Sequence, residues 1–426
     1  MAVILVGTLD TKGAELGYVR DLLRGLGLAT IVVDVGTVGP PAIAPDVARD
    51  EVMRRAGTTP AAITARGDRG EAVGAMARGV AALVREWHDR GEVEGAFGLG
   101  GSAGTVIGSS AMRALPFGIP KVLVSTLASG QTRPFVESSD IALFHPVADI
   151  AGLNRLTRVA LGNAAHALAG MVRGRAGATE GAVGGSRPLV VAASMFGVTT
   201  RCVDRARATL EGLARDGGRP AEVLVFHATG AGGRAMEALI GDGQVDAVLD
   251  LTTTELADEL VGGILSAGPD RLRAAVGRGL PQVVGVGALD MVNFGPRATV
   301  PDRFDGRTFH VHNPSVTLMR TTPAENAELG RRLAMTLAES RVPTVVLLPL
   351  GGVSAIDVPG SDWHDPAANA ALFAAIHAGL DGHPTVAVVD RPEAINDPAF
   401  ADEAARRLHS LVARVRPDHP TELPPS

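Results

Sequence analysis

The chain has 426 residues, of which 46% are hydrophobic and only 3% aromatic, and its formal net charge is −6. This length exceeds what one hydrophobic core usually serves, and an aliphatic composition favours buried parallel sheets over an all-β sandwich. The acidic balance argues against nucleic acid as the main partner, and no apolar run approaches the roughly 20 residues that span a bilayer.

Five short apolar runs in the first half alternate with segments of helical period, which is typical of βαβ units and a parallel sheet. The predicted strands are residues 3–6, 30–35, 95–99, 121–124 and 141–144. The predicted helices are residues 14–26, 70–90, 104–115 and 150–172. These elements predict a Rossmann-like nucleotide-binding domain over residues 1–174.

Residues 175–187 are small and polar without periodicity, and they predict a linker. The plan then repeats, run for run, with predicted strands at residues 189–193, 222–226, 247–251, 282–286 and 308–311, extended by 344–348 and 385–389. We expect a second Rossmann-like domain over residues 188–416 and a loose, Pro-rich tail at residues 417–426. The predicted fold class is α/β, with two doubly wound, mostly parallel sheets and an interdomain cleft for ligands.

A glycine-rich segment, Gly98-Leu-Gly-Gly-Ser-Ala-Gly-Thr105, ends the third predicted strand and opens a helix. Backbone N–H groups of such a turn, together with the helix N-terminus and nearby hydroxyls, attract a phosphate. The candidate phosphate-binding residues here are Gly100, Gly101, Ser102, Gly104 and Thr105. The alternative is a turn in which glycine serves only tight strand-to-helix packing.

Two standard nucleotide motifs fit this segment poorly. The chain has no Gly-x-x-x-x-Gly-Lys-Ser/Thr sequence, so the segment is not a P-loop. Gly98, Gly100 and Ala103 satisfy a relaxed dinucleotide fingerprint, but the next predicted strand ends in Ser125 and Thr126 instead of an acidic residue for the ribose. An NAD-linked enzyme therefore remains a weaker alternative to an ATP-binding protein.

The first predicted strand ends in a polar segment, Gly7-Thr-Leu-Asp-Thr-Lys-Gly13. We expect a nucleotide to contact its residues Gly7, Thr8, Asp10, Thr11 and Lys12. Lys12 would neutralise a phosphate and Asp10 would hold Mg²⁺, because a hard cation prefers carboxylate oxygen. Helix capping by Asp10 or Thr11 beside a solvated Lys12 is an equal alternative.

A third hydroxyl-rich segment follows the fourth predicted strand and contributes Ser125, Thr126, Ser129 and Gly130 to the candidate nucleotide site. Arg133 would add a bidentate phosphate contact. The alternative is an ordinary loop built from turns of serine and threonine.

In the second half, the segment His227-Ala-Thr-Gly-Ala-Gly-Gly-Arg-Ala-Met-Glu237 is another glycine loop between a strand and a helix. We predict that its Thr229, Gly232, Gly233 and Arg234 bind an anionic substrate. An ordinary tight turn with a surface arginine is the alternative.

The other polar residues at the strand ends do not form a recognisable catalytic or metal pattern. Asp250, Glu255, Asp290 and Asn293 complete the predicted substrate side. His145, His310 and His312 lack the spacing of zinc ligands, and neither a Gly-x-Ser-x-Gly elbow nor a Ser/His/Asp order is present.

Four of the segments described above, residues 7–13, 98–105, 125–130 and 227–237, resemble in order and spacing the Tm-1-like ATP-binding family, also called uncharacterised protein family 0261. Three later segments, residues 351–357, 359–366 and 395–400, look like its C-terminal pattern, so the resemblance covers nearly the whole chain. The resemblance implies two Rossmann-like domains, ATP with Mg²⁺ bound in the N-terminal one, and a homodimer. It supplies no catalytic residues.

Two functions follow as expectations. The first is an ATP- and Mg²⁺-dependent enzyme that acts on a small anionic substrate in the cleft. The alternative is a two-lobed regulatory or sensor protein that binds the nucleotide without turnover, because no committed nucleophile or base is recognisable. The start lacks the basic region of a signal peptide and the single cysteine, Cys202, excludes an intrachain disulfide, so we expect a cytoplasmic protein.

Overall fold

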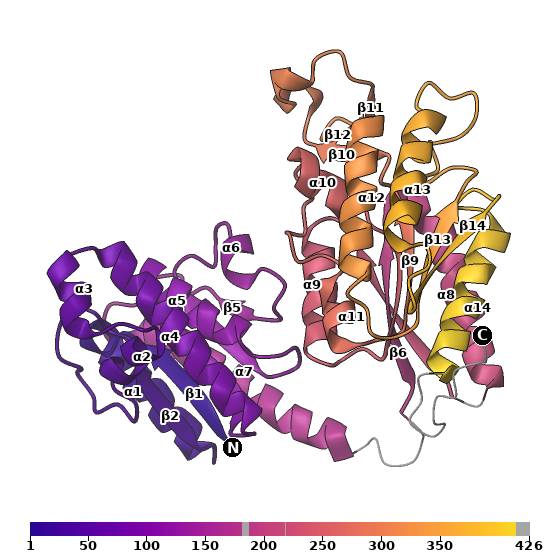
Figure 1. Cartoon of the computed structure of the whole chain (residues 1–426). Coiled ribbons are helices and arrows are strands. Elements are labelled where there is room, and N and C mark those ends of the chain that lie inside the picture. The colour runs from indigo at the N-terminus through magenta and orange to yellow at the C-terminus, as the bar shows by residue number, and fades with distance from the viewer. Residues whose placement is uncertain (181–186, 218, 415–426) are drawn as a thin grey trace. The chain divides into compact units, whose positions relative to one another are not determined.

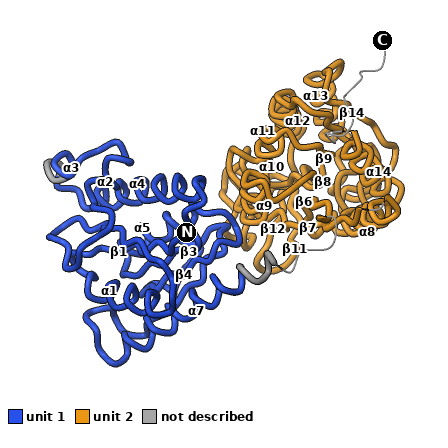
Figure 2. Tube along the Cα trace, turned by 90° about the horizontal axis from the view of Figure 1, so that it is seen from below, with its two compact units in different colours: residues 1–185 blue, residues 186–426 orange. Residues whose placement is uncertain are grey.

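The computed structural model describes residues 1–180, 187–217 and 219–414. The chain divides into two compact units, residues 1–185 and 186–426, which we call unit 1 and unit 2 (Figure 2). Within the described residues, no helix is both long enough and apolar enough to cross a membrane.

Unit 1 is a five-stranded parallel sheet in the order β2-β1-β3-β4-β5 with helices on both faces (Figure 1). Its strands are β1 (Ala2–Gly7), β2 (Thr30–Asp34), β3 (Val93–Gly100), β4 (Lys121–Ser125) and β5 (Ala142–Phe144). Its helices are α1 (Leu9–Gly25), α2 (Arg49–Arg55), α3 (Pro60–Arg66), α4 (Arg69–Asp89), α5 (Ser102–Arg113), α6 (Arg133–Val136) and α7 (Arg155–Glu180). All five predicted strands are confirmed within about two residues.

The interior strand β1 explains why both faces of this sheet are covered. All six of its residues are buried, and alternate side chains point to opposite faces. Val3 and Leu5 pack with α1 and α7, whereas Ile4 and Val6 pack with α2, α4 and α5. The chain leaves β1 toward β2 on one side and returns to β3 on the other, so a topological switch point lies between the carboxyl ends of β1 and β3.

Unit 2 contains a six-stranded parallel sheet in the order β14-β13-β9-β8-β6-β7. Its strands are β6 (Leu189–Met195), β7 (Ala221–His227), β8 (Ala247–Thr252), β9 (Gln282–Gly287), β13 (Thr344–Pro349) and β14 (Val386–Arg391). Its helices are α8 (Thr200–Asp216), α9 (Ala231–Gly241), α10 (Glu255–Val261), α11 (Arg273–Arg278), α12 (Pro323–Leu337), α13 (Pro366–Leu380) and α14 (Pro398–Arg414). Short 3₁₀ turns lie at Gly197–Thr199, Arg297–Thr299 and Asp302–Phe304.

The predicted fifth strand of the second sheet is wrong in its placement. The run at residues 308–311 forms β11 (Phe309–Asn313), which belongs to a separate antiparallel sheet with β10 (Met291–Phe294) and β12 (Val316–Arg320). A parallel strand needs a crossover of a dozen or more residues, whereas β11 and β12 are joined by a tight turn that permits only a hairpin. The second half therefore does not repeat the first run for run.

The predicted domain boundary differs from the structure at one point. Helix α7 continues to Glu180, so the first residues of the predicted linker at 175–187 are helical. Residues 181–186 of that linker, and the predicted tail at residues 417–426, lie outside the described residues.

Candidate functional site

A pocket of about 310 Å³ lies at the switch point of unit 1. It is lined by Thr8, Asp10, Thr11, Lys12, Thr37, Val38, Arg69, Gly101, Ser102, Ala103, Gly104 and Asp149. Seven predicted nucleotide-binding residues therefore come together here, from the segments that follow β1 and β3. This is the position at which open parallel sheets bind ligands.

The first turn of α5 forms one wall of the pocket. The helix begins after Gly101, and no described side chain caps it. The first amides of a helix lack carbonyl partners within the helix, so those of Ser102, Ala103 and Gly104 suit an anion. Because Gly101 is a normal extended residue and an added Cβ would come no closer than 3.7 Å to Thr126 Oγ1, its position does not require glycine for packing.

Gly100 and Gly104 have a different role from Gly101. Gly100 has a φ of +156°, and a Cβ there would lie 2.8 Å from the Cα of Gly104. A Cβ on Gly104 would lie 2.8 Å from the carbonyl oxygen of Leu99. The packing alternative considered from the sequence therefore holds for these two positions, which let β3 and α5 approach each other closely.

Asp10 brings a carboxylate to the opposite wall. Its Oδ2 accepts hydrogen bonds from the N–H groups of Val38 at 2.8 Å and Gly39 at 3.2 Å. Its Oδ1 is buried and has no hydrogen-bond partner among the described residues. An unpaired, acceptor-only oxygen of this kind fits a hard cation.

The residues of the β1 segment near Asp10 are partly engaged by the protein itself. The ammonium of Lys12 donates to the carbonyl oxygen of Ile150. The hydroxyls of Thr8 and Thr11 hydrogen bond to each other at 2.8 Å. Lys12 thus holds the segment before α7 in addition to lining the pocket.

The remaining predicted nucleotide-binding residues do not line this pocket: Gly7, Gly100, Thr105, Ser125, Thr126, Ser129 and Gly130. Thr105 Oγ1 and Ser125 Oγ lie 2.6 Å apart, and both side chains are buried. Thr105 also donates to the carbonyl of Gly101, and Ser125 accepts the N–H of Leu127. These hydroxyls join the first turn of α5 to the end of β4 instead of lining the pocket.

Four of the pocket's side chains come from outside the segments that the sequence singles out. Thr37 and Val38 follow β2, Arg69 begins α4, and Asp149 precedes α7. The arginine predicted for this role, Arg133, lies on α6 and is not in the lining. No local motif marks Arg69 or Asp149, because only the fold brings their segments to the strand ends.

In unit 2, the predicted substrate-binding loop after β7 is filled by the chain itself. Oε1 of Glu255 accepts hydrogen bonds from the N–H groups of Gly230 at 2.7 Å and Gly233 at 3.1 Å. A Cβ on Gly232 would collide with the carbonyl of His227, so that glycine serves packing. Arg234 donates to the carbonyl of Ser266 at 2.8 Å. The hydroxyl of Thr229 donates to the carbonyl of His227 at 3.2 Å.

A buried ion cluster holds Glu255 in that position. Arg271 is 2% exposed and donates to Glu255 at 2.8 Å and to Asp250 Oδ1 at 2.8 Å. It also contacts Glu237 at 3.2 Å. The pKa of the Glu237 carboxyl is raised by burial, which the nearby guanidinium of Arg271 offsets only in part. Asp250 and Glu255, predicted for the substrate side, are therefore partners of Arg271.

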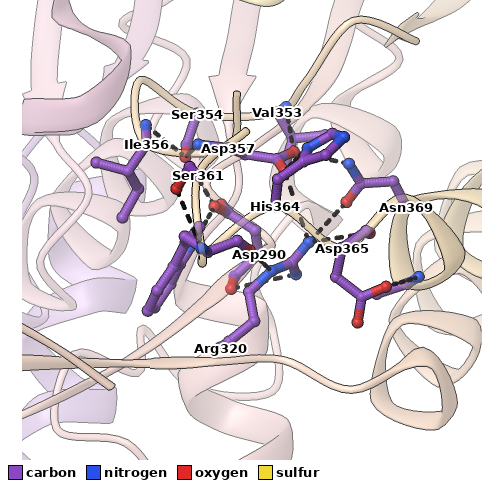
Figure 3. A network of polar contacts seen from close by, with 12 residues as sticks. Asp290, Arg320, Val353, Ser354, Ile356, Asp357, Ser361, His364, Asp365 and Asn369 are labelled. Atoms are coloured by element: carbon purple, nitrogen blue, oxygen red, sulfur yellow. Dashed lines mark hydrogen bonds and ion pairs between the residues drawn. The ribbon is translucent and has the colours of Figure 1, made fainter. Parts of the chain in front are cut away.

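A second polar network in unit 2 fixes the loop after β13 to the small antiparallel sheet (Figure 3). Arg320 of β12 donates to the carbonyl of Trp363 and to Oδ1 of Asn369, both at 3.0 Å. Oδ2 of Asp290 accepts hydrogen bonds from the hydroxyl of Ser354 and the indole of Trp363, both at 2.7 Å. Burial raises the pKa of the Asp290 carboxyl.

The same loop contains an aspartate–histidine pair. Asp357 is fully buried, and its Oδ1 lies 2.8 Å from Nδ1 of His364, which is partly exposed (Figure 3). Its Oδ2 accepts hydrogen bonds from the N–H of Val353 at 3.0 Å and from Asn369 at 2.7 Å. The buried carboxylate thereby orients the imidazole and closes the loop on itself.

Asn293, which the sequence places on the substrate side, contacts Asp258 of α10. Nδ2 of Asn293 donates to Oδ2 of Asp258 at 2.7 Å, and the N–H groups of Asn293 and Leu265 donate to Oδ1. Burial raises the pKa of Asp258 to about 7. Within the described residues, no group of three or more histidine, cysteine, aspartate or glutamate side chains forms a metal site.

Two α/β units, each built on a parallel sheet, define a two-domain Rossmann-like protein. In the first unit, a pocket lined by helix amides and a carboxylate lies at the switch point. Comparison with family models gives the family. Residues 1–177 match the N-terminal domain, and residues 187–412 the C-terminal domain, of the Uncharacterised protein family (UPF0261). The chain belongs to the UPF0261 family.

Relatives from bacteria and a plant support this membership. A UPF0261 protein of Clostridium tetani is 46% identical over 97% of this chain and 99% of its own length. A UPF0261 protein of Rhizobium meliloti is 44% identical over 96% of this chain and 99% of its own. The ToMV resistance protein Tm-1(GCR237) of Solanum lycopersicum is 44% identical over 78% of this chain, which corresponds to 44% of the tomato protein.

Proposed function

We propose that this protein binds ATP together with Mg²⁺ in the pocket of unit 1 and uses the nucleotide in a reaction on a small anionic substrate. The observation that carries the proposal is the meeting of two features at the switch point. The uncapped first turn of α5 favours phosphate, and the unpaired Oδ1 of Asp10 favours a hard cation. Together they match the two halves of a magnesium nucleotide.

Mg²⁺ needs only one or two protein carboxylates when a nucleotide supplies further oxygens. Asp10 and Asp149 both line the pocket, and either would hold the ion directly or through water. The lack of a larger acidic or histidine cluster in the described residues is compatible with this mode of binding. The resemblance of the sequence motifs to an ATP-binding family supports the same ligand.

Titration calorimetry with ATP, in the presence and absence of Mg²⁺, tests the proposal. The informative variant is Gly101→Leu, which adds bulk to the pocket lining at a position where a Cβ meets no close neighbour. The matched control is Gly170→Leu, because Gly170 lies on α7 and its Cβ would face open space. We expect ATP binding in the wild type and the control, and its loss in Gly101→Leu. Absence of heat with the wild-type protein at high concentration would remove the proposal.

A nucleotide-binding regulatory protein without turnover is the second candidate. One observation favours it: the described lining contains neither histidine nor cysteine, which are common acid–base and nucleophilic groups. Release of ADP, followed over hours with candidate carboxylate substrates, separates the two. Sustained turnover would exclude the regulatory function.

The substrate, the assembly and the location belong to the same proposal. We do not assign the substrate to the glycine loop after β7, because Glu255 already accepts its amide hydrogens. The family resemblance supports a homodimer, which sedimentation velocity would test. The single cysteine of the chain supports a cytoplasmic location.

A further inference from the structure

The pocket of unit 1 is lined by four charged side chains: Asp10, Lys12, Arg69 and Asp149. Lys12 already donates to the carbonyl of Ile150. Arg69, in contrast, forms neither a hydrogen bond nor an ion pair with any described residue. Of the two cations in this lining, Arg69 is therefore the one that keeps all of its hydrogen-bond donors available to a ligand.

The backbone that carries Arg69 is anchored although its side chain is exposed. Arg69 is the first residue of α4, and the preceding residue, Asp68, caps the helix. Oδ1 of Asp68 accepts the N–H groups of Gly70 at 2.7 Å and Glu71 at 3.2 Å. The cap fixes the point from which the guanidinium extends, which lowers the entropy lost when it binds.

The chemistry of this side chain indicates its ligand. A guanidinium presents several N–H donors in a planar fork that fits two phosphate oxygens at once, whereas backbone amides carry only partial charge. We infer that Arg69 binds the terminal phosphate of the nucleotide and sets the preference of the pocket for triphosphates over monophosphates. This inference rests on the proposed function, because it assigns selectivity to the same pocket.

Titration calorimetry with ATP, ADP and AMP in the presence of Mg²⁺ tests the assignment. The variants are Arg69→Gln, which removes the charge, and Arg69→Lys, which keeps the charge without the fork. The control is Arg78→Gln, which makes the same charge change on an exposed residue of the same helix outside the pocket lining. Thermal unfolding of each variant confirms that it is folded, and Arg69 forms no hydrogen bond or ion pair with the described residues whose loss would destabilise the chain.

We expect the wild type and Arg78→Gln to prefer ATP over AMP by at least about tenfold. In Arg69→Gln the affinity for ATP should fall roughly 10- to 100-fold while that for AMP changes less than about threefold, as expected for loss of one charged contact. Arg69→Lys should lie between them. If the wild type binds ATP and Arg69→Gln prefers ATP over AMP as strongly as the control does, Arg69 is not the selective residue. The proposed function would still stand in that case. If the wild type binds none of the three nucleotides, both fail.

Discussion

Glu255 and Gly233 are neighbours across two elements of unit 2: the carboxylate of Glu255 accepts the N–H of Gly233 at 3.1 Å. Two amides of the glycine loop after β7 thus donate to a carboxylate, but that carboxylate is a side chain of the same protein and not the expected substrate. The loop is therefore part of the core of unit 2, and its glycines are expected to matter for stability.

Replacing Gly233 with alanine should destabilise the protein, because the new Cβ would collide with the carboxylate of Glu255. That carboxylate cannot move freely, since it is buried and bonded to Arg271. We expect a loss of about 1–3 kcal/mol in the free energy of unfolding, measured by urea denaturation. Gly241→Ala, on the same helix with open space around its Cβ, is the control and should be neutral or slightly stabilising. Equal stability of the two variants would contradict the close contact.

Removing the charge of Arg271 should have a pH-dependent cost. Arg271→Met leaves the buried carboxylates of Asp250, Glu255 and Glu237 without their cation, and breaking such a pair typically costs about 3–5 kcal/mol. Burial raises the pKa of the Glu237 carboxyl, and without the guanidinium of Arg271 this effect is no longer opposed. The folded variant then binds more protons than the unfolded chain, so its stability falls as the pH rises.

Urea denaturation at pH 5 and pH 8 measures this effect. The loss caused by Arg271→Met should be larger at pH 8 than at pH 5. Arg273→Met is the control, because Arg273 is exposed and lies 3.8 Å from Glu339. A loss independent of pH would mean that the carboxylates are solvated and that the cluster is not a closed ionic core.

The raised pKa of Asp258 predicts a second pH dependence, in which the stability of the protein falls as the pH rises. Its pKa is about 7 in the folded protein, chiefly because of burial, against 3.8 ordinarily. The folded state therefore holds the proton more tightly, and the stabilising contribution present at low pH is lost as the pH rises through about 7. Between roughly pH 5 and pH 6.5 this group should lower the free energy of unfolding by about 1.4 kcal/mol per pH unit.

The variant Asp258→Asn removes this titration and isolates it from other groups. The difference in unfolding free energy between the wild type and Asp258→Asn should shift in favour of the variant as the pH increases from 5 to 8. Denaturation curves at four pH values suffice. A constant difference would show that Asp258 titrates outside this range.

Asp10→Asn tests the proposed magnesium ligand while preserving the loop contacts, because an amide oxygen can still accept the N–H groups of Val38 and Gly39. We expect the Mg²⁺-dependent gain in ATP affinity to fall by about tenfold or more, which is the range seen when support of a metal ligand is lost. Asp21→Asn, an exposed site paired with Arg20, is the control. An unchanged magnesium effect in Asp10→Asn would place the ion elsewhere.

Two glycines of the β3–α5 turn should respond differently to alanine. In Gly104→Ala the Cβ meets the backbone carbonyl of Leu99 at 2.8 Å, which cannot move without shifting β3. We expect a loss of about 1–3 kcal/mol in thermal or urea unfolding. Gly101→Ala has room for its methyl group and should keep the stability of the wild type. Equal losses would show that Gly101 also serves strand-to-helix packing.

The alternation of aliphatic runs and helical periods predicts both parallel sheets, because β1 and its neighbours are buried on both faces and carry few polar residues. It fails at residues 308–311, where the short turn between β11 and β12 outweighs the apolar pattern. Of the three segments expected at one nucleotide site, those after β1 and β3 line the pocket, whereas the one after β4 does not. The sequence pattern does not distinguish Gly101, which lines the pocket freely, from Gly104, which is required for packing.

The order of amino acids alone therefore predicts the strands of the two parallel sheets and the glycine turns, since these depend on periodicity and on neighbours within a few residues. Only the folded chain reveals that Arg69 and Asp149 enter the pocket and that Glu255 fills the second glycine loop. These contacts join segments separated by tens of residues. A local pattern specifies the backbone shape of an anion site, whereas the charge that occupies it depends on which distant side chains the strand order brings within reach.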